Sequence, residues 1–584
     1  MMALRGRRSH PVREIQPEEI FLDSSNLPHL DESQFEGRVE HPVSHLALLG
    51  VGVMFALGVI IFFGRAFSLE AVHGTAYAEV SRENRLSRSI IFASRGIIYD
   101  RNGRAVASNE VPLNDSQSES SGEHSAEQNV LAASSTPFAF RHYIALPGLS
   151  NLIGFVRYPK QDDSGAWWRE EYAGASGVEL TYDARLRGEN GSRLIESDAR
   201  GKVEREHIVI PPRTGSDIHL TIDADVESTL YSLLFAHARE QGFEGGASVI
   251  MDVKTGDILA LTSFPEYDHA AFAAGNASAI RALNSDPHTP LLNRALSGLY
   301  APGSIVKPIF AAGALNEGII RPDTQIESTG QLVVPNPYDA AHPSIFKDWK
   351  PLGWLDMKHA IAVSSDQYFY TIGGGFGSQQ GLGIARLDAY ARLFGLGSKT
   401  GIALSGEQDG VVPTPEWKEH VFGKDDPWRI GDTYHTAIGQ YGFQITPLQA
   451  VRYIAAIAHG GSLVTPKLTE GERVRTSFIG ISEDKLQVIR EGMRMAVSSE
   501  SPDRTARALD MGGITIAGKT GTAQVGEHNQ WMNSWSVGFW PAGNPRFAFA
   551  TVLERAPAGT LSGAAPAMRP FFDWLVANKP EYVQ

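Results

Sequence analysis

The sequence predicts an α+β domain, with an antiparallel sheet and helices, that follows a mostly β segment and one transmembrane helix. Two observations carry this prediction. Strand-like patterns at 247–263 return at 513–525 and 534–554, and an uncharged apolar run occupies 46–63. Helical stretches lie between the strand patterns, near 305–317, 356–372, 384–394 and 447–459. A sheet assembled from the two ends of one domain explains the strands, and a membrane span explains the apolar run.

The composition excludes several kinds of chemistry. The chain has 584 residues, no cysteine and a net charge of −14. Disulfides, thiolate zinc sites and cysteine catalysis are therefore excluded. His41 and His45 alone have the H-x-x-x-H spacing, but they lack the glutamate of a helical zinc motif, so we expect no metal site. No basic run carries interleaved aromatic residues, so we expect no nucleic acid partner, and nothing in the sequence calls for a cofactor.

The apolar run from Leu46 to Phe63 has 18 residues, which meets the minimum for a membrane span. A buried core helix is one alternative. A signal peptide cleaved near Ala76–Ala78 is another, but the run is long for a signal and many residues precede it. The sequence therefore predicts an uncleaved anchor at 45–64. Arginines on both sides of the run leave its orientation undecided.

The rest of the chain divides by composition. Residues 1–44 are polar and are predicted to be a disordered tail. Residues 65–235 form a further segment, here called the pedestal, with a Ser- and Glu-rich flexible insert at 111–137. Within the pedestal, Asp100–Gly103 consists of residues that favour a turn and lies between two strand-like runs. The α+β domain is predicted to occupy 236–584.

Two Ser-x-x-Lys motifs compete for the role of nucleophile and base. Ser344 and Lys347 run into Asp-Trp-Lys-Pro, which has no helical periodicity. Ser304 instead follows a Pro-Gly pair and opens an apolar, alanine-rich helix. Positions three apart share one face of a helix, so Lys307 can reach the Ser304 hydroxyl. The sequence therefore favours Ser304 as nucleophile with Lys307 as its base.

The triplet Lys-Thr-Gly occurs three times, so the triplet by itself does not identify the functional lysine. Lys254 and Lys399 begin triplets at predicted turns. Lys519 alone lies within a strand-like run, GITIAGKTGTAQV, whose small residues allow another backbone to approach closely. The predicted functional triplet is therefore Lys519, Thr520 and Gly521, with a second hydroxyl at Thr522.

A third polar triplet, Ser364-Ser365-Asp366, lies between the other two. Such a serine pair is often only a helix cap. Its order and spacing after Ser304 and before Lys519 favour a place in the same site, with Ser364 and Asp366 as catalytic residues.

With these motifs the chain resembles the class B penicillin-binding proteins. The stretches that carry the resemblance in the catalytic part are NRALSGLYAPGSIVKP, SSDQYFY, PTPEWK, GDTYHTAIGQYGFQITPLQA and GKTGTAQ. RGIIYDRNGR and GASGVELTYDARLRGENG resemble the pedestal of that class. The likeness covers 95–108 and about 150–555. Within the class it is strongest to the elongation-type group, penicillin-binding protein 2, and a division-type or spore-type relative is the nearest alternative.

The resemblance implies a D,D-transpeptidase that crosslinks peptidoglycan stem peptides ending in D-Ala-D-Ala and that β-lactams inhibit. Ser304 would attack the penultimate D-Ala carbonyl, terminal D-Ala would leave, and an amine of a neighbouring stem would resolve the acyl-enzyme. Lys307 would take the serine proton and Ser364 would relay it to the leaving amine. The backbone N–H groups of Ser304 and Thr522 would form an oxyanion hole. The substrate carboxylate would bind Lys519, Thr520 and Thr522.

Asp366 departs from the Ser-x-Asn pattern of the wider superfamily. An ionised aspartate only accepts hydrogen bonds, whereas asparagine also donates them. Beside Lys307 it would favour the charged ammonium and oppose a resting neutral base. We hypothesise that Asp366 holds Lys307 charged until substrate closes the site.

The implied substrate lies outside the cytoplasmic membrane. The resemblance therefore places the tail in the cytoplasm and residues 65–584 in the periplasm, on a single-pass inner-membrane protein. It also implies a separate glycan polymerase of the rod complex and its scaffold proteins as partners. The pedestal is short between Arg104 and His142, which puts some of those contacts in doubt. A β-lactamase would need a carboxylate base for deacylation, and no Glu-x-x-x-Asn-like element lies between 366 and 519. A sensor would need a signalling domain; a non-catalytic scaffold of this fold stays open.

Overall fold

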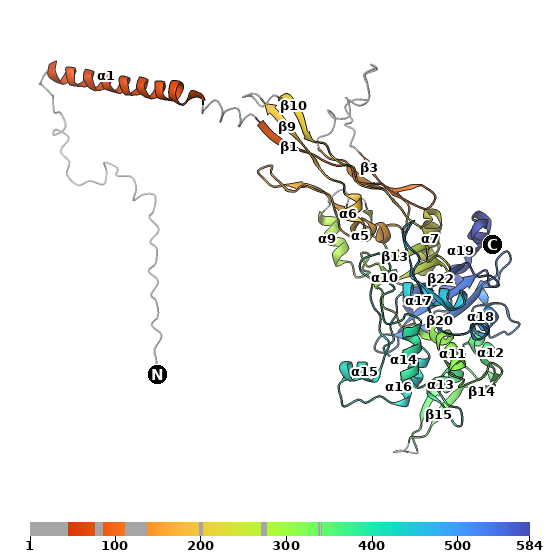
Figure 1. The fold of residues 1–584 in the computed structure, drawn as a ribbon. Coiled ribbons are helices and arrows are strands. Elements are labelled where there is room, and N and C mark those ends of the chain that lie inside the picture. Colours follow the sequence, from red (N-terminus) through yellow and green to blue (C-terminus); the bar gives the residue numbers. More distant parts are fainter. Residues whose placement is uncertain are drawn as a thin grey trace, which may run out of the picture. The chain divides into compact units, whose positions relative to one another are not determined.

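The computed structural model describes residues 45–75, 86–110, 137–197, 203–269, 272, 277–336, 339 and 341–584 (Figure 1). The predicted disordered tail and all but the last residue of the predicted flexible insert lie outside these ranges. The chain divides into two units, 1–87 with 197–202 and 88–196 with 203–584.

The first unit contains the predicted membrane span. Helix α1 (His45–Phe67) carries the apolar run and continues as a short π-helix (Ser68–Val72). None of its residues is buried, and at about 1.5 Å per residue it is about 35 Å long. Among the described residues, this is the helix that is long and apolar enough to cross a membrane. It fits a single-pass membrane protein.

The pedestal is mostly β, as predicted. One sheet has the order β1 (Leu86–Ile91), β9 (Gly191–Ser197), β10 (Val203–Ile210), and a second has β11 (Ile218–His219), β2 (Ile98–Tyr99), β3 (Ala105–Glu110), β4 (Phe140–Tyr143). The predicted turn joins β2 to β3, and Asp100 Oδ1 accepts from the N–H groups of Asn102 (2.9 Å) and Arg104 (2.8 Å). Shorter elements complete the pedestal: β5 (Val156–Arg157), β6 (Lys160–Gln161), β7 (Trp167–Arg169), β8 (Ala173–Gly174), α4 (Ser150–Ile153), α5 (Gly177–Thr181) and α6 (Asp183–Leu186).

A buried ion cluster joins distant parts of the pedestal. Arg95 and Arg141 each bond one carboxylate oxygen of Glu179 at 2.7 Å, and all three side chains are fully buried. Arg95 also pairs with Asp183 at 2.8 Å. Arg95 of the first pedestal motif and Glu179 of the second therefore meet in one hydrogen-bonded cluster, in which opposite charges are paired.

The catalytic part is built on a five-stranded antiparallel sheet. Its order is β13 (Ile258–Phe264), β12 (Gly245–Asp252), β22 (Phe547–Pro557), β21 (Trp531–Trp540), β20 (Ala517–Val525). Gly246 pairs with Leu553 and Gly521 with Trp535. The prediction of a sheet assembled from both ends of the domain is confirmed. β20 begins at Ala517 rather than at residue 513.

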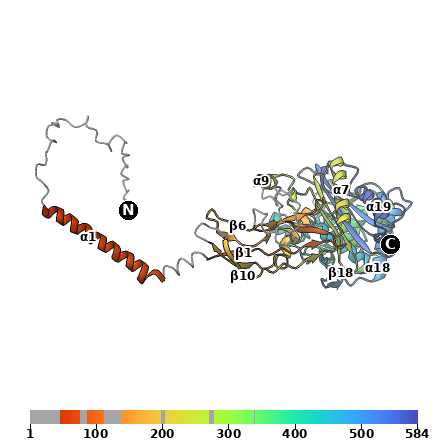
Figure 2. The same cartoon turned by 90° about the horizontal axis from the view of Figure 1, so that it is seen from above.

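Helices cover both faces of this sheet. Val249 and Met251 of β12 pack in one core with α11 (Lys307–Asn316) and α17 (Pro447–Ala458). Ile250 points the other way, into a second core with α7 (Ala224–Gln241) and α19 (Ala564–Asn578), which lie side by side (Figure 2). This alternation is the period of a strand that is buried on both faces. α18 (Glu483–Ser498) contributes to both cores.

The helical stretch predicted at 356–372 is two helices, which corrects the prediction. α12 (Met357–Val363) ends at Ser364, whose φ of 60° is left-handed, and α13 (Asp366–Gly374) begins two residues later. α14 (Ile384–Leu393) and α17 lie where the sequence places them. The remaining elements are α9 (Ala277–Ser285), α10 (Arg294–Ser297), α15 (Pro415–Phe422), α16 (Ile430–Ala437), β14 (Ile326–Ser328), β15 (Gln331–Val334), β16 (Ser344–Lys347), β17 (Gly353–Leu355), β18 (Ser462–Val464) and β19 (Thr476–Phe478).

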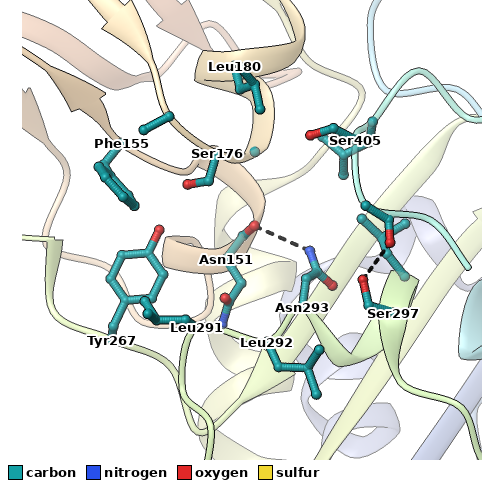
Figure 3. Close-up of a pocket in the computed structure, with 15 residues that line it drawn as sticks. Asn151, Phe155, Ser176, Leu180, Tyr267, Leu291, Leu292, Asn293, Ser297 and Ser405 are labelled. Atoms are coloured by element: carbon teal, nitrogen blue, oxygen red, sulfur yellow. Dashed lines mark hydrogen bonds between the residues drawn. The ribbon is translucent and has the colours of Figure 1, made fainter. Parts of the chain in front are cut away.

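Pedestal and catalytic residues meet around a pocket of about 350 Å³ (Figure 3). Asn293 Nδ2 donates to the carbonyl oxygen of Asn151 at 3.3 Å across it, and Ser297 Oγ donates to the carbonyl oxygen of Gly406 at 2.6 Å. None of the predicted site residues lines this pocket. The predicted boundary at residue 235 falls inside α7, which packs on β13.

Candidate active site

Ser304 lies in a 3₁₀ turn (Gly303–Val306) directly before α11. Neighbouring elements hold this turn: Gly303 N–H donates to the Gly439 carbonyl at 2.9 Å, and the Tyr453 hydroxyl donates to the Ile305 carbonyl at 2.7 Å. Gly303 has a φ of 54°, and a Cβ there would lie 2.7 Å from the carbonyl oxygen of Thr522. A glycine is therefore required where the turn meets β20.

Lys307 is the first residue of α11 and is fully buried. Its ammonium donates to Asp366 Oδ1 at 2.6 Å, to the Ser364 carbonyl at 2.8 Å and to Ser364 Oγ at 3.3 Å. Among the described residues, no hydrogen bond joins it to Ser304 Oγ. The expected hydrogen bond between Lys307 and Ser304 is thus absent, and the Lys307 ammonium donates to Asp366 and Ser364 instead.

Ser364 brings the second and third motifs together. Lys519, on β20, donates to Ser364 Oγ at 2.8 Å and to the Thr520 carbonyl at 2.8 Å. Lys519 is also fully buried, and this burial, reinforced by the charge of Lys307, lowers the pKa of Lys519 well below its usual value. One serine hydroxyl therefore accepts from two buried lysines.

These groups form the floor and walls of a pocket of about 260 Å³. It is lined by Ser304, Trp349, Ser364, Asp366, Thr505, Thr520, Gly521 and Thr522. A Cβ at Gly521 would lie 2.8 Å from the Pro302 carbonyl oxygen, so the small residue allows the serine turn to pack against β20. β20 ends the sheet, which leaves backbone groups on its outer side available to an extended peptide.

The competing motifs lie elsewhere. Lys254 follows β12 at the turn to β13, Lys399 follows α14 in a loop, and both are exposed. Ser344 and Lys347 are the ends of strand β16 and are also exposed. The choice of motifs from the sequence therefore matches the residues that the fold brings together.

Three residues at the site were not predicted: Thr505 and Trp349, which line the pocket, and Asp348. Trp349 lines the pocket with half of its surface exposed, and its Nε1 donates to the Val363 carbonyl at 3.2 Å. Asp348 lies behind it, at the start of α13. Both follow the rejected Ser344 motif in the sequence, and no spacing rule links them to Ser304.

A serine at the mouth of a pocket, with a hydroxyl and two lysines behind it, is an arrangement for acyl transfer. The family described as "Penicillin binding protein transpeptidase domain" matches residues 246–573, and "Penicillin-binding Protein dimerisation domain" matches 124–220. The peptidoglycan D,D-transpeptidase MrdA of Escherichia coli strain K12 is 30% identical over 612 residues, covering 90% of this chain and 93% of the relative.

The chain belongs to the penicillin-binding proteins. Two solved structures agree. A complex between PBP2 and MreC from Helicobacter pylori has a TM-score of 0.68 at 27% identity and covers 85% of this chain and 99% of its own. A structure titled "Structural coordination of polymerization and crosslinking by a peptidoglycan synthase complex" has a TM-score of 0.68 at 26% identity and covers 91% and 98%. This penicillin-binding protein is accordingly a serine D,D-transpeptidase of the elongation type, and the resemblance drawn from the motifs is confirmed.

Proposed function

We propose that this penicillin-binding protein crosslinks stem peptides ending in D-Ala-D-Ala through an acyl-enzyme on Ser304. The observation that carries the proposal is the convergence on Ser364 Oγ of Lys307 at 3.3 Å and Lys519 at 2.8 Å, in one pocket with Ser304. Three motifs from three elements meet there, and each supplies a group that acyl transfer requires.

In the acylation step, Ser304 Oγ forms a bond to the penultimate D-Ala carbonyl carbon, and the bond from that carbon to the terminal D-Ala nitrogen breaks. The serine proton passes through Lys307 and Ser364 to the leaving amine. An amine of a second stem then displaces Ser304 and restores its hydroxyl. The backbone N–H groups of Ser304 and Thr522 would stabilise the oxyanion.

The terminal carboxylate of the donor would bind beside β20. Thr520 and Thr522 offer hydroxyls at the pocket, Lys519 offers charge, and Gly521 keeps the strand close to the serine turn. A carboxylate there would restore a favourable environment for a charged Lys519.

The location of the substrate also supports an orientation of the chain across the membrane. We propose that 1–44 is a cytoplasmic tail, that α1 anchors the chain in the inner membrane at 45–64, and that the pedestal (65–235) and the transpeptidase domain (236–584) lie in the periplasm. The apolar helix supports the anchor, and the location of peptidoglycan supports the orientation.

The similar structures also support a proposal about the partners of this chain. One similar structure is of PBP2 with MreC, and another is of a peptidoglycan synthase complex. We propose that this chain likewise works with rod-complex scaffold proteins and a separate glycan polymerase, and that β-lactams acylate Ser304.

Covalent labelling of the full-length protein with a fluorescent penicillin tests the catalytic proposal. We expect stable labelling that Ser304→Ala abolishes and that Ser344→Ala, the matched change in the other Ser-x-x-Lys, leaves intact. Labelling that survives Ser304→Ala would overturn the assignment. Rapid release of hydrolysed drug would indicate a β-lactamase, and no labelling at all would indicate a scaffold.

A further inference from the structure

A single carboxylate, that of Asp348, gathers five hydrogen-bond donors at the start of α13. Asp348 directly follows β16, and only 8% of its surface is exposed. Its Oδ1 accepts from the N–H groups of Trp349 (2.9 Å) and Asp366 (3.0 Å), and its Oδ2 from Ser328 Oγ (3.0 Å), Ser365 Oγ (2.6 Å) and Gln367 N–H (3.1 Å).

No cation compensates this buried charge. Among the described residues, no lysine, arginine or histidine lies within ion-pair distance of Asp348. The five donors and the positive end of the α13 dipole take that role instead. A buried carboxylate that is stabilised by hydrogen bonds alone holds its donors in place, because each donor that moves away leaves the charge less well satisfied.

Three of the five donors belong to residues 365–367, which directly follow Ser364 in the chain. Ser365 is fully buried and caps α13 by accepting from Tyr368 N–H at 3.2 Å. Ser364 immediately precedes it in a left-handed conformation that a serine rarely adopts. That conformation directs the Ser364 hydroxyl to Lys519 and leaves Asp366 in contact with Lys307.

We propose that Asp348 is a positioning residue for the transpeptidation reaction: it fixes the start of α13 and thereby places Ser364 and Asp366 on the two lysines. This inference rests on the proposed role of Ser304 and its partners. Asp348 itself touches no reacting atom. It acts through Ser365 and the backbone of Asp366, so its loss would displace catalytic groups without removing any.

Asp348→Asn separates acceptor chemistry from volume. The two side chains have nearly the same shape, but the amide nitrogen is a donor. If the amide nitrogen takes the place of Oδ2, it faces the N–H group of Gln367. If it takes the place of Oδ1, it faces the N–H groups of Trp349 and Asp366. These backbone donors cannot rotate away, so either orientation breaks the cap. Ser328→Ala is a milder change that removes one donor and leaves α13 itself untouched.

Full-length protein in detergent is reacted with penicillin, and two quantities are measured: the acylation rate at saturating drug and the drug concentration that gives half that rate. For Asp348→Asn we expect the saturating rate to fall about 10- to 100-fold, since displacements of about 1 Å cost up to about 100-fold. The half-saturating concentration should change less than about threefold. Ser328→Ala should give a smaller fall in rate and keeps the test open if Asp348→Asn does not fold.

Asp223→Asn is the control for loss of a helix-capping carboxylate, although Asp223, unlike Asp348, also pairs with Lys579 at 3.1 Å. Asp223 is also a buried carboxylate that caps a helix, α7, and accepts from several donors, including Tyr582 and Asn102. It should lose stability to urea as Asp348→Asn does, with an unchanged acylation rate. Equal rates in Asp348→Asn, Ser328→Ala and the unmodified protein, with Ser304 labelled in all, would overturn the positioning role alone. Absence of labelling at Ser304 in the unmodified protein would overturn it together with the proposed function.

Discussion

At the residue scale, the two lysines of the site differ in their surroundings. Lys307 faces a carboxylate, Asp366, at 2.6 Å. Lys519 has a serine hydroxyl and a carbonyl oxygen as its hydrogen-bond acceptors. Burial, reinforced by the charge of Lys307, disfavours the charged form of Lys519. Substrate would change both environments, because its carboxylate would bind near Lys519 and its carbonyl near Lys307.

Asp366→Asn tests whether the carboxylate holds Lys307 charged. Removing the negative charge would make loss of the Lys307 proton easier. We expect the variant to keep more of its penicillin acylation rate at acidic pH than the unmodified protein does, measured as acylation rate against pH. An unchanged profile with normal rates at neutral pH would contradict the hypothesis.

Proton uptake on ligand binding tests the environment of Lys519. Burial, reinforced by the charge of Lys307, lowers the pKa of Lys519 well below its usual value, and a bound carboxylate would raise that pKa again. Calorimetry of Ser304→Ala with a D-Ala-D-Ala peptide, in buffers of different ionisation enthalpy, should show uptake of up to about one proton per peptide between the lowered and usual values. Lys399→Met, in the surface Lys-Thr-Gly, should not alter the uptake. Proton release, or none at any pH, would contradict this account.

At the element scale, the packing of α7 on β13 contains a buried acid. Glu227 of α7 is fully buried, and its Oε2 accepts from Leu261 N–H at 2.6 Å. Burial, with a smaller effect of Glu266, raises the pKa of Glu227 to about 8. This junction is therefore sensitive to pH although it lies away from the active site.

Glu227→Gln should remove that sensitivity. Between the ordinary value of 4.5 and about 8, the folded chain binds a proton that the unfolded chain releases, so stability falls as pH rises through this window. Glutamine keeps an acceptor for Leu261 and carries no charge. We expect the variant to gain about 1–3 kcal/mol in urea unfolding at pH 8 and to differ little near pH 4.5. Glu240→Gln, exposed on the same helix, is the control, and equal gains in both variants would refute the explanation.

At the scale of the whole molecule, local signals predicted more than long-range ones. Ser304, Lys307 and Lys519 were found because each lies in a segment whose own pattern marks it as helix or strand. The break at Ser364 was missed because one left-handed residue hardly disturbs the apolar pattern of 356–372. Asp348 and Trp349 were missed because their place under α13 arises only when β15 and β16 fold back on it, which no local pattern encodes.

The proposed orientation is tested by proteolysis of intact spheroplasts that carry the full chain with an epitope tag before residue 1. We expect external protease to cut the chain beyond residue 85 and to leave the tag on a protected fragment that includes α1. Loss of the tag before the spheroplasts are opened would show the opposite orientation.

The order of strands in the sheet has a consequence for synthesis. β22 lies between β12 and β21, so the first-made strands of the domain find their central neighbour only near the end of translation. The hydrophobic helix leaves the ribosome long before Lys519 does. If α1 is the anchor that we propose, a nascent chain is tethered while Ser304 still lacks the strand that faces it. We then expect the proposed reactivity toward penicillin only when β20 to β22 have emerged and closed the sheet.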